Sequence, residues 1–93
     1  MSMNQNTGSD IPLEIVNRIK KSFCEALSKS FTEEEFSILK FKDTREWDSI
    51  SHIRLMSVLR EEFSIKFSFE EMVKMTTFQE VKRVITEHRE KSD

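Results

Sequence analysis

The chain has 93 residues, of which 37% are hydrophobic and 34% are charged. A chain of about 100 residues supports one small core, and this apolar share is enough to fill it, which excludes a multidomain protein and a disordered chain. Fifteen basic and seventeen acidic residues leave a net charge of −2, which offers no broad positive field to nucleic-acid phosphates. We therefore expect one globular domain without a nucleic-acid partner.

No apolar run reaches about 18 residues, the length typical of a membrane-spanning helix. Residues 1–10 are polar and contain no signal-peptide core. Cys24 is the single cysteine, so it has no partner for an internal disulfide, and we interpret it as a small buried apolar residue. We expect a cytoplasmic monomer with no membrane partner.

Residues 1–10 contain nothing to pack and are expected to be a disordered N-terminal tail, followed by a folded domain at 11–90. Asp10 can cap the first helix, and Pro12 suits its first turn, where a missing N–H costs little. Apolar residues recur at three- and four-residue steps through 12–28, at Val16, Ile19, Phe23 and Leu27. This spacing predicts the first helix.

A long, partly irregular connection is expected at residues 29–48, where no period is sustained. Within it, Thr32 and Glu35 have the spacing of a capping box for one short turn. The connection also carries large apolar residues at Phe31, Phe36, Ile38, Leu39, Phe41 and Trp47. These are too many for a free linker, so we expect this loop to lie on the core.

Helical periodicity returns at Ser49, which predicts the second helix. One arc of this helix carries His52, Leu55, Met56, Leu59 and Phe63. We expect that arc to face the core. Ile50 falls on the opposite side with Arg54 and Ser57, so an isoleucine should be exposed there.

Two further capping boxes, Ser68 with Glu71 and Thr77 with Glu80, predict two more helices. The longer one carries its apolar stripe at Phe78, Val81, Val84, Ile85 and His88. The sequence therefore predicts an all-α fold. It is a small four-helix bundle, with three longer helices plus a short third helix and a long loop between helices one and two.

Ser49 directly follows Asp48 at the start of the second helix, and either side chain can accept from the free N–H groups there. Only one of them is needed as the cap. The other interpretation of Ser49 is a modifiable hydroxyl, because a phosphate on it would lie at the positive end of the helix dipole. The exposed Ile50 beside it is typical of a docking site.

Asp-Ser-Ile at 48–50 is similar to the Asp-Ser-Leu attachment motif of the acyl and peptidyl carrier proteins, with isoleucine in place of leucine. REEF resembles the end of that family's second helix. SFEEMVKMTTFQEV resembles its short third helix and the lead into the fourth. The resemblance covers about half of the chain, and residues 12–30 fit the first helix by pattern only.

This resemblance implies that a phosphopantetheinyl transferase moves 4′-phosphopantetheine from coenzyme A to Ser49. The thiol of that arm then holds acyl groups as thioesters. Asp48 would assist the transferase and its metal, or serve as a plain cap. The chain is expected not to be an enzyme, because no base is placed to activate the serine. It would carry acyl or aminoacyl groups for acyl-loading and acyl-transfer enzymes in a specialised pathway, such as polyketide, peptide or modified-sugar assembly.

A partner-docking face is expected at Ile50, Ile53, Arg54, Ser57 and Met72, although scattered surface residues are the alternative. Fatty-acid carriers are strongly acidic along their second helix, whereas this chain has Arg54 and Arg60 there. Steering by basic partner enzymes should therefore be weaker or differently patterned, which argues against ordinary fatty-acid synthesis.

His52 lies one turn beyond Ser49 on the inner arc. It is a candidate for the mouth of an acyl-binding groove, or a partly buried histidine with ordinary partners. Trp47 stands where fatty-acid carriers have a small residue, and we expect it to pack between the loop and the second helix. His88 is the only other histidine, so no metal site is expected.

Two other function classes stay open. One is an unmodified, carrier-like helical adaptor that acts through protein–protein interaction at the same Ile50 face. The other is a small helical nucleic-acid binder, which the scattered acids disfavour. Its basic residues would be Lys20, Lys21, Lys82, Arg83 and Arg89.

Overall fold

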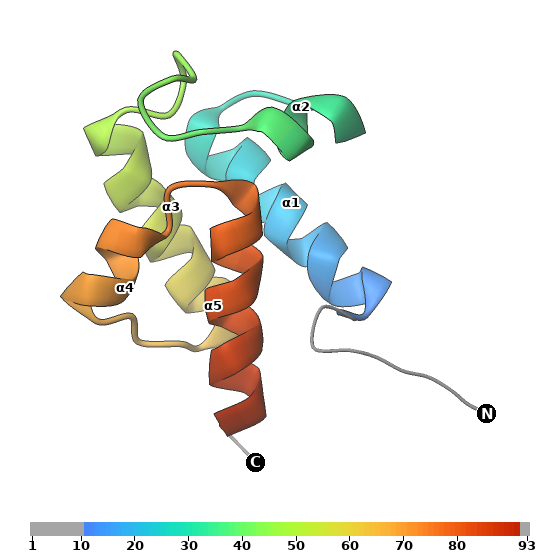
Figure 1. Cartoon of the computed structure of the whole chain (residues 1–93), viewed down its shortest axis with the longest axis vertical. Helices are drawn as coiled ribbons and strands as arrows, with labels where there is room; N and C mark the ends of the chain where they lie inside the picture. The colour runs from blue at the N-terminus through green and yellow to red at the C-terminus, as the bar shows by residue number, and fades with distance from the viewer. Residues whose placement is uncertain (1–10, 92–93) are drawn as a thin grey trace.

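The computed structural model describes residues 11–91, and this range contains five helices (Figure 1). They are α1 (Leu13–Leu27), α2 (Glu33–Ile38), α3 (Ser49–Phe63), α4 (Phe69–Lys74) and α5 (Phe78–Lys91). The described range has no strand, only an isolated antiparallel bridge between Lys40 and Thr77. The prediction of an all-α chain is confirmed. None of the described helices is long and apolar enough to cross a bilayer.

The first helix begins close to its predicted start, but without a side-chain cap. The residue before it is Pro12, which has no side-chain acceptor, although its carbonyl accepts from the Ile15 N–H at 2.9 Å and the Val16 N–H at 3.1 Å. The expected Asp10 cap and the expected tail at 1–10 lie outside the described residues.

The connection between α1 and α3 contains a helix that the prediction of four helices missed. At its start Thr32 Oγ1 accepts from the Glu35 N–H at 3.1 Å, and Glu35 Oε1 accepts from the Thr32 N–H at 2.8 Å. This is the predicted capping box. The expected single turn extends to six residues because Phe36 is buried against Phe78, with ring centroids 4.7 Å apart. A helix this short depends on such tertiary packing, so periodicity alone does not reveal it.

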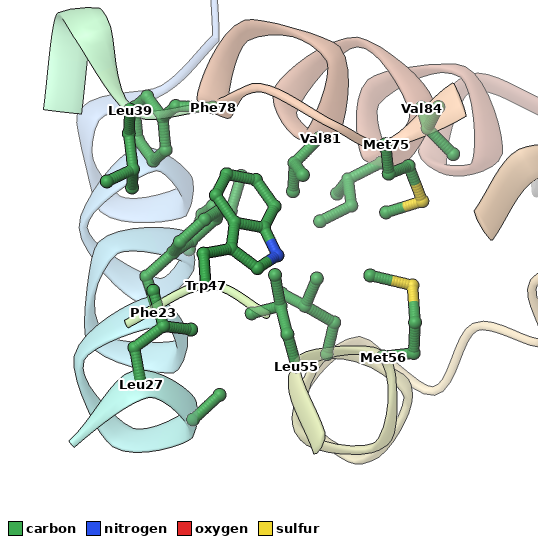
Figure 2. Close-up of a cluster of buried hydrophobic side chains, with 14 of the residues drawn as sticks. Phe23, Leu27, Leu39, Trp47, Leu55, Met56, Met75, Phe78, Val81 and Val84 are labelled. Carbon is green, nitrogen blue, oxygen red and sulfur yellow. The ribbon is translucent and has the colours of Figure 1, made fainter. Parts of the chain in front are cut away.

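The core forms where α1 packs against α3 and where α2 packs against α5. Trp47, from the connection, has no exposed surface and lies among side chains of α1, α3 and α5 (Figure 2). Its ring contacts Phe23 edge-on at 5.1 Å between centroids, and Phe23 contacts Phe78 at 5.3 Å. The expected packing role of Trp47 is confirmed. Cys24 is half-buried against this core, not fully buried as expected.

The chain between α2 and α3 is held to the core at several points. The Phe41 N–H donates to the Thr76 carbonyl at 2.9 Å, which ties the loop to the α4–α5 connection. Further along, the Lys42 N–H donates to the Trp47 carbonyl at 3.0 Å, and the Trp47 N–H donates to the Thr44 carbonyl at 2.9 Å. These bonds fix the backbone that leads directly into Ser49.

Replacing Trp47 by alanine should lower the free energy of unfolding by about 3–5 kcal/mol, because the substitution empties the centre of the core. Urea unfolding followed by far-UV circular dichroism measures this change. Ile38→Ala is the matched control, since Ile38 is 77% exposed and its loss should change stability by less than about 0.5 kcal/mol. Equal effects of the two substitutions would contradict the central position of Trp47.

Candidate functional site

Asp48 and Ser49 stand at the start of α3, and the structure distinguishes their roles. Asp48 is the cap: its Oδ1 accepts from the Ser51 N–H at 2.9 Å, and its carbonyl accepts from the His52 N–H at 2.8 Å. Ser49 is the first residue of the helix and is exposed. Because Asp48 supplies the cap, the Ser49 hydroxyl is left at the surface beside the positive end of the helix.

The carboxylate of Asp48 is stabilised mainly by the backbone N–H of Ser51. This hydrogen bond lowers the pKa of Asp48 below its ordinary value of 3.8, despite some desolvation. The group is therefore ionised at neutral pH. A negative charge is thus already held at this helix end, next to the exposed hydroxyl.

An apolar surface adjoins Ser49. Ile50 and Ile53 are each 70% exposed, which confirms the exposure expected for Ile50. On α4, Phe69 is 76% exposed and Val73 is 58% exposed, and both line a common hollow with Ile53. Four large apolar side chains on two neighbouring helices exceed what isolated surface residues explain. We call these four residues the apolar face.

The other expected docking residues differ in their exposure. Arg54 and Ser57 are exposed, although Arg54 Nη1 donates to the Ala26 carbonyl at 3.4 Å near the end of α1. Met72 is half-buried and packs against the core, so its side chain contributes less surface than expected. The sequence interpretation missed Phe69 and Val73. Their four-residue spacing on α4 was the available signal.

A hollow of about 300 Å³ lies between α3 and α4. It is lined by Phe41, His52, Ile53, Met56, Phe69, Met72, Val73 and Thr76. Only His52 and Thr76 bring polar side-chain atoms to this lining. His52 and Ile53 follow Ser49 by three and four residues, so Ser49 lies one helical turn away on the same side of α3.

His52 has hydrogen bonds at both ring nitrogens. Trp47 Nε1 donates to Nδ1 at 3.0 Å, and Nε2 is 2.8 Å from the Met72 carbonyl oxygen. The ring also lies against Phe41, with centroids 4.9 Å apart. His52 therefore lines the hollow and is also a partly buried histidine whose polar atoms are satisfied.

The cations considered for nucleic-acid binding do not form one free patch. Lys20 pairs with Glu33, and Arg83 pairs with both Glu80 and Glu87, which raises the pKa of Arg83. Lys82 lies over the Phe78 ring at 5.1 Å. Three of the five cations are therefore engaged within the protein.

A larger hollow of about 510 Å³ runs along α5. Its lining is Ile11, Gln79, Glu80, Lys82, Arg83, Thr86, Glu87 and Glu90. The charges in it include the Arg83 ion pairs, and it contains no histidine, cysteine or serine. Its Arg83 guanidinium is paired with Glu80 and Glu87, and its Thr86 hydroxyl donates to the Lys82 carbonyl, so we place the candidate site at Ser49 and not at this larger hollow.

A histidine of α5 also contacts a carboxylate of α4. His88 Nε2 lies 2.8 Å from Glu71 Oε2. Partial burial raises the pKa of Glu71, but the Ser68 N–H and His88 together lower it by more, so the net shift is downward. Within residues 11–91 no group of three histidine, cysteine or acidic side chains is placed to hold a metal ion.

Comparison with protein-family models, with curated proteins and with solved structures gave no match to this chain. The functional interpretation therefore depends on the exposed Ser49 hydroxyl, the apolar face and the hollow between α3 and α4.

Substitutions at Asp48 should separate its charge from its capping geometry. Asp48→Ala should lower the free energy of unfolding at about pH 7, and Asp48→Asn should lower it less, because asparagine still accepts a hydrogen bond. The folded-state pKa is below 3.8, so the stability from the charge is present above that pH and is lost as the pH falls through the folded value.

The stability gap between the wild type and Asp48→Asn should therefore shrink between about pH 7 and about pH 3. Urea unfolding at a series of pH values measures it. A gap that does not change with pH would show that the Asp48 charge does not interact with the helix end.

Proposed function

We propose that this protein is an acyl or aminoacyl carrier that bears 4′-phosphopantetheine on Ser49 and holds acyl groups as thioesters on that arm. The observation that carries the proposal is that the two residues at the start of α3 have different roles. Asp48 caps the helix through the Ser51 N–H, and Ser49 stays exposed at the helix N-terminus. A phosphodiester at this position would be favoured by the helix dipole.

In the attachment step the Ser49 oxygen forms a bond to the phosphorus that bears the pantetheine arm. The phosphoanhydride bond of coenzyme A breaks, adenosine 3′,5′-bisphosphate leaves, and the serine proton passes to a base of the transferase. The nearby His52 does not offer that base, since both of its ring nitrogens have partners. The protein would therefore be the substrate of its partner enzymes, and Asp48 would assist the transferase and its metal.

The hollow between α3 and α4 supports the carrier role. It lies one turn from Ser49, and its lining is almost entirely apolar. Met56 and Met72 are unbranched and adapt to different occupants. The acyl group on an arm fixed to Ser49 would thus bind in the apolar hollow of the same molecule. His52 would lie at the edge of that hollow.

The docking surface would be the apolar face, with Arg54 and Ser57 beside it on α3. The first turn of α3 after its cap contains no acidic residue, and the exposed residues of that helix near Ser49 include Ile50 and Ile53. Contacts with the transferase and the acyl-loading and acyl-transfer enzymes would then depend on apolar burial more than on charge.

We also propose how the helices correspond to a carrier bundle, and where the protein works. Helices α1, α3, α4 and α5 would correspond to the four helices of a carrier bundle, with α2 as an addition in the connection. The carrier would be a cytoplasmic monomer that serves a specialised pathway such as polyketide, peptide or modified-sugar assembly.

Incubation of the full chain with a broad-specificity phosphopantetheinyl transferase, Mg²⁺ and coenzyme A should add one phosphopantetheine group. Intact-mass spectrometry measures the product. Ser49→Ala should abolish the addition, whereas Ser37→Ala, which removes an exposed hydroxyl of α2, should leave it unchanged. An unmodified wild type, or an equally modified Ser49→Ala variant, would overturn the proposal.

Ile50→Ser should slow this transfer by at least about tenfold, because a buried isoleucine contributes roughly 1.5–3 kcal/mol to a contact. Initial rates at limiting carrier concentration measure the effect. Ile38→Ser is the matched control, since Ile38 is 77% exposed but lies on α2. If both variants slow the transfer equally, Ile50 has no particular role in docking.

The exposed apolar face also suits an unmodified adaptor, because it exists whether or not Ser49 is modified. The two functions differ in one result. Partner binding that is lost in Ile50→Ser but unchanged in Ser49→Ala, by a chain that no transferase modifies, would identify the adaptor.

A further inference from the structure

Lys42 lies at the edge of the hollow between α3 and α4. Its ammonium is 5.6 Å from the centroid of the Phe41 ring, and Phe41 lines that hollow. Lys42 is exposed, and no acidic side chain within residues 11–91 forms an ion pair with it. Within the described chain, a positive charge without an acidic partner therefore adjoins an apolar hollow.

The backbone holds Lys42 in this place from both sides. The Phe41 N–H donates to the Thr76 carbonyl at 2.9 Å, and the Lys42 N–H donates to the Trp47 carbonyl at 3.0 Å. Lys42 also has a φ of 75°, in the left-handed region, where glycine or asparagine is more stable than lysine. Sparsely populated backbone conformations cluster at ligand-binding sites. A lysine at this position therefore indicates a role for its side chain.

The hollow itself suits an unbranched apolar chain. Its volume of about 300 Å³ corresponds to roughly ten groups of the size of a water molecule. Besides His52, whose two ring nitrogens have partners, the lining contains no ionisable side chain. A charge inside the hollow would thus lack a partner, whereas methylene groups there would be stabilised by burial.

We propose that this hollow binds a free aliphatic carboxylate of about eight to ten carbons, with its chain between α3 and α4 and its carboxylate against the Lys42 ammonium. The apolar lining complements the chain, and the unpaired cation complements the charge of the head group. Lys42 is exposed and is not part of the lining, so the carboxylate stays in water at the edge of the hollow. No charge has to be buried for the ligand to bind.

The other charges of α4 and of the start of α3 leave an anion at Lys42 unopposed. The Asp48 carboxylate is bound to the backbone of the first turn of α3. On α4, Glu71 is bound by the cap of its own helix and by α5. Glu70 and Lys74 are both exposed, and their charges offset each other. The cation beside Phe41 therefore determines which head group is attracted.

This ligand site goes beyond the carrier function, because it needs no bond to Ser49. In a carrier, such an acid would compete with the attached acyl group for the same hollow. Binding is measured on the unmodified full chain, so the failure of this site and the failure of phosphopantetheine attachment are separate results.

NMR titration of the ¹⁵N-labelled, unmodified chain with octanoate tests the site. The amide signals of Ile53 and Val73 should shift and saturate, whereas that of Ile38 on α2 should not shift. Binding should tighten about three- to fourfold for each methylene group added between butanoate and octanoate, because each one adds a buried apolar group.

The head group is tested by reversing its charge. At neutral pH octylammonium has an eight-carbon chain with a positive end, and it should bind at least about threefold more weakly than octanoate. Lys42→Gln should weaken octanoate binding about two- to fivefold and should not weaken octylammonium binding. Lys40→Gln is the matched control, since it removes an exposed lysine of the same loop and should have less effect.

Two further variants test the place of the chain. Val73 is 58% exposed, so Val73→Trp should fold normally by far-UV circular dichroism, yet its indole should fill part of the hollow and weaken octanoate binding at least about tenfold. Ser49→Ala should bind octanoate as the wild type does.

Octanoate shifts that do not saturate, or octylammonium that binds as tightly as octanoate, would overturn the proposal. Equal losses of affinity in Lys42→Gln and Lys40→Gln, unchanged affinity in Val73→Trp, or lost affinity in Ser49→Ala would do the same. Binding to phosphatidylglycerol vesicles without saturable octanoate binding would identify a lipid surface instead, and would also overturn it.

Discussion

The burial of one indole ring organises this molecule. Trp47 belongs to the connection between α2 and α3, yet it occupies the centre of the core with no exposed surface. Phe23 packs edge-on against the indole. The backbone of Trp47 forms hydrogen bonds with Lys42 and Thr44. Burial of so large a ring is a major contribution to a core of this size. It also fixes where the connection must end.

The position of the candidate site depends on where this connection ends and α3 begins. One residue beyond Trp47, Asp48 reaches the first free N–H groups of α3 and caps them, and the next residue, Ser49, is left at the surface. The same indole sets the tautomer of His52, which in turn contacts α4 across the hollow. A packing interaction thus places an exposed hydroxyl, an apolar face and an apolar hollow within about one helical turn of each other.

Sequence reasoning was most successful where local chemistry decides the structure. The capping boxes at Thr32 and Ser68 and the exposed Ile50 need only neighbouring residues, and all three are confirmed. The extent of α2 was missed because a short helix depends on tertiary contacts such as Phe36 against Phe78. The half-buried position of Met72 was missed for a similar reason, since a helix of six residues gives too short a pattern to orient.

The central claim is that the hydroxyl at the start of α3 carries a phosphopantetheine arm. The most direct measurement is peptide mapping by mass spectrometry of the protein purified from its own cells. The carrier account predicts a phosphopantetheine group on the peptide that contains Ser49 and on no other peptide. Protein that is unmodified at Ser49 in cells that modify their other carriers would contradict it.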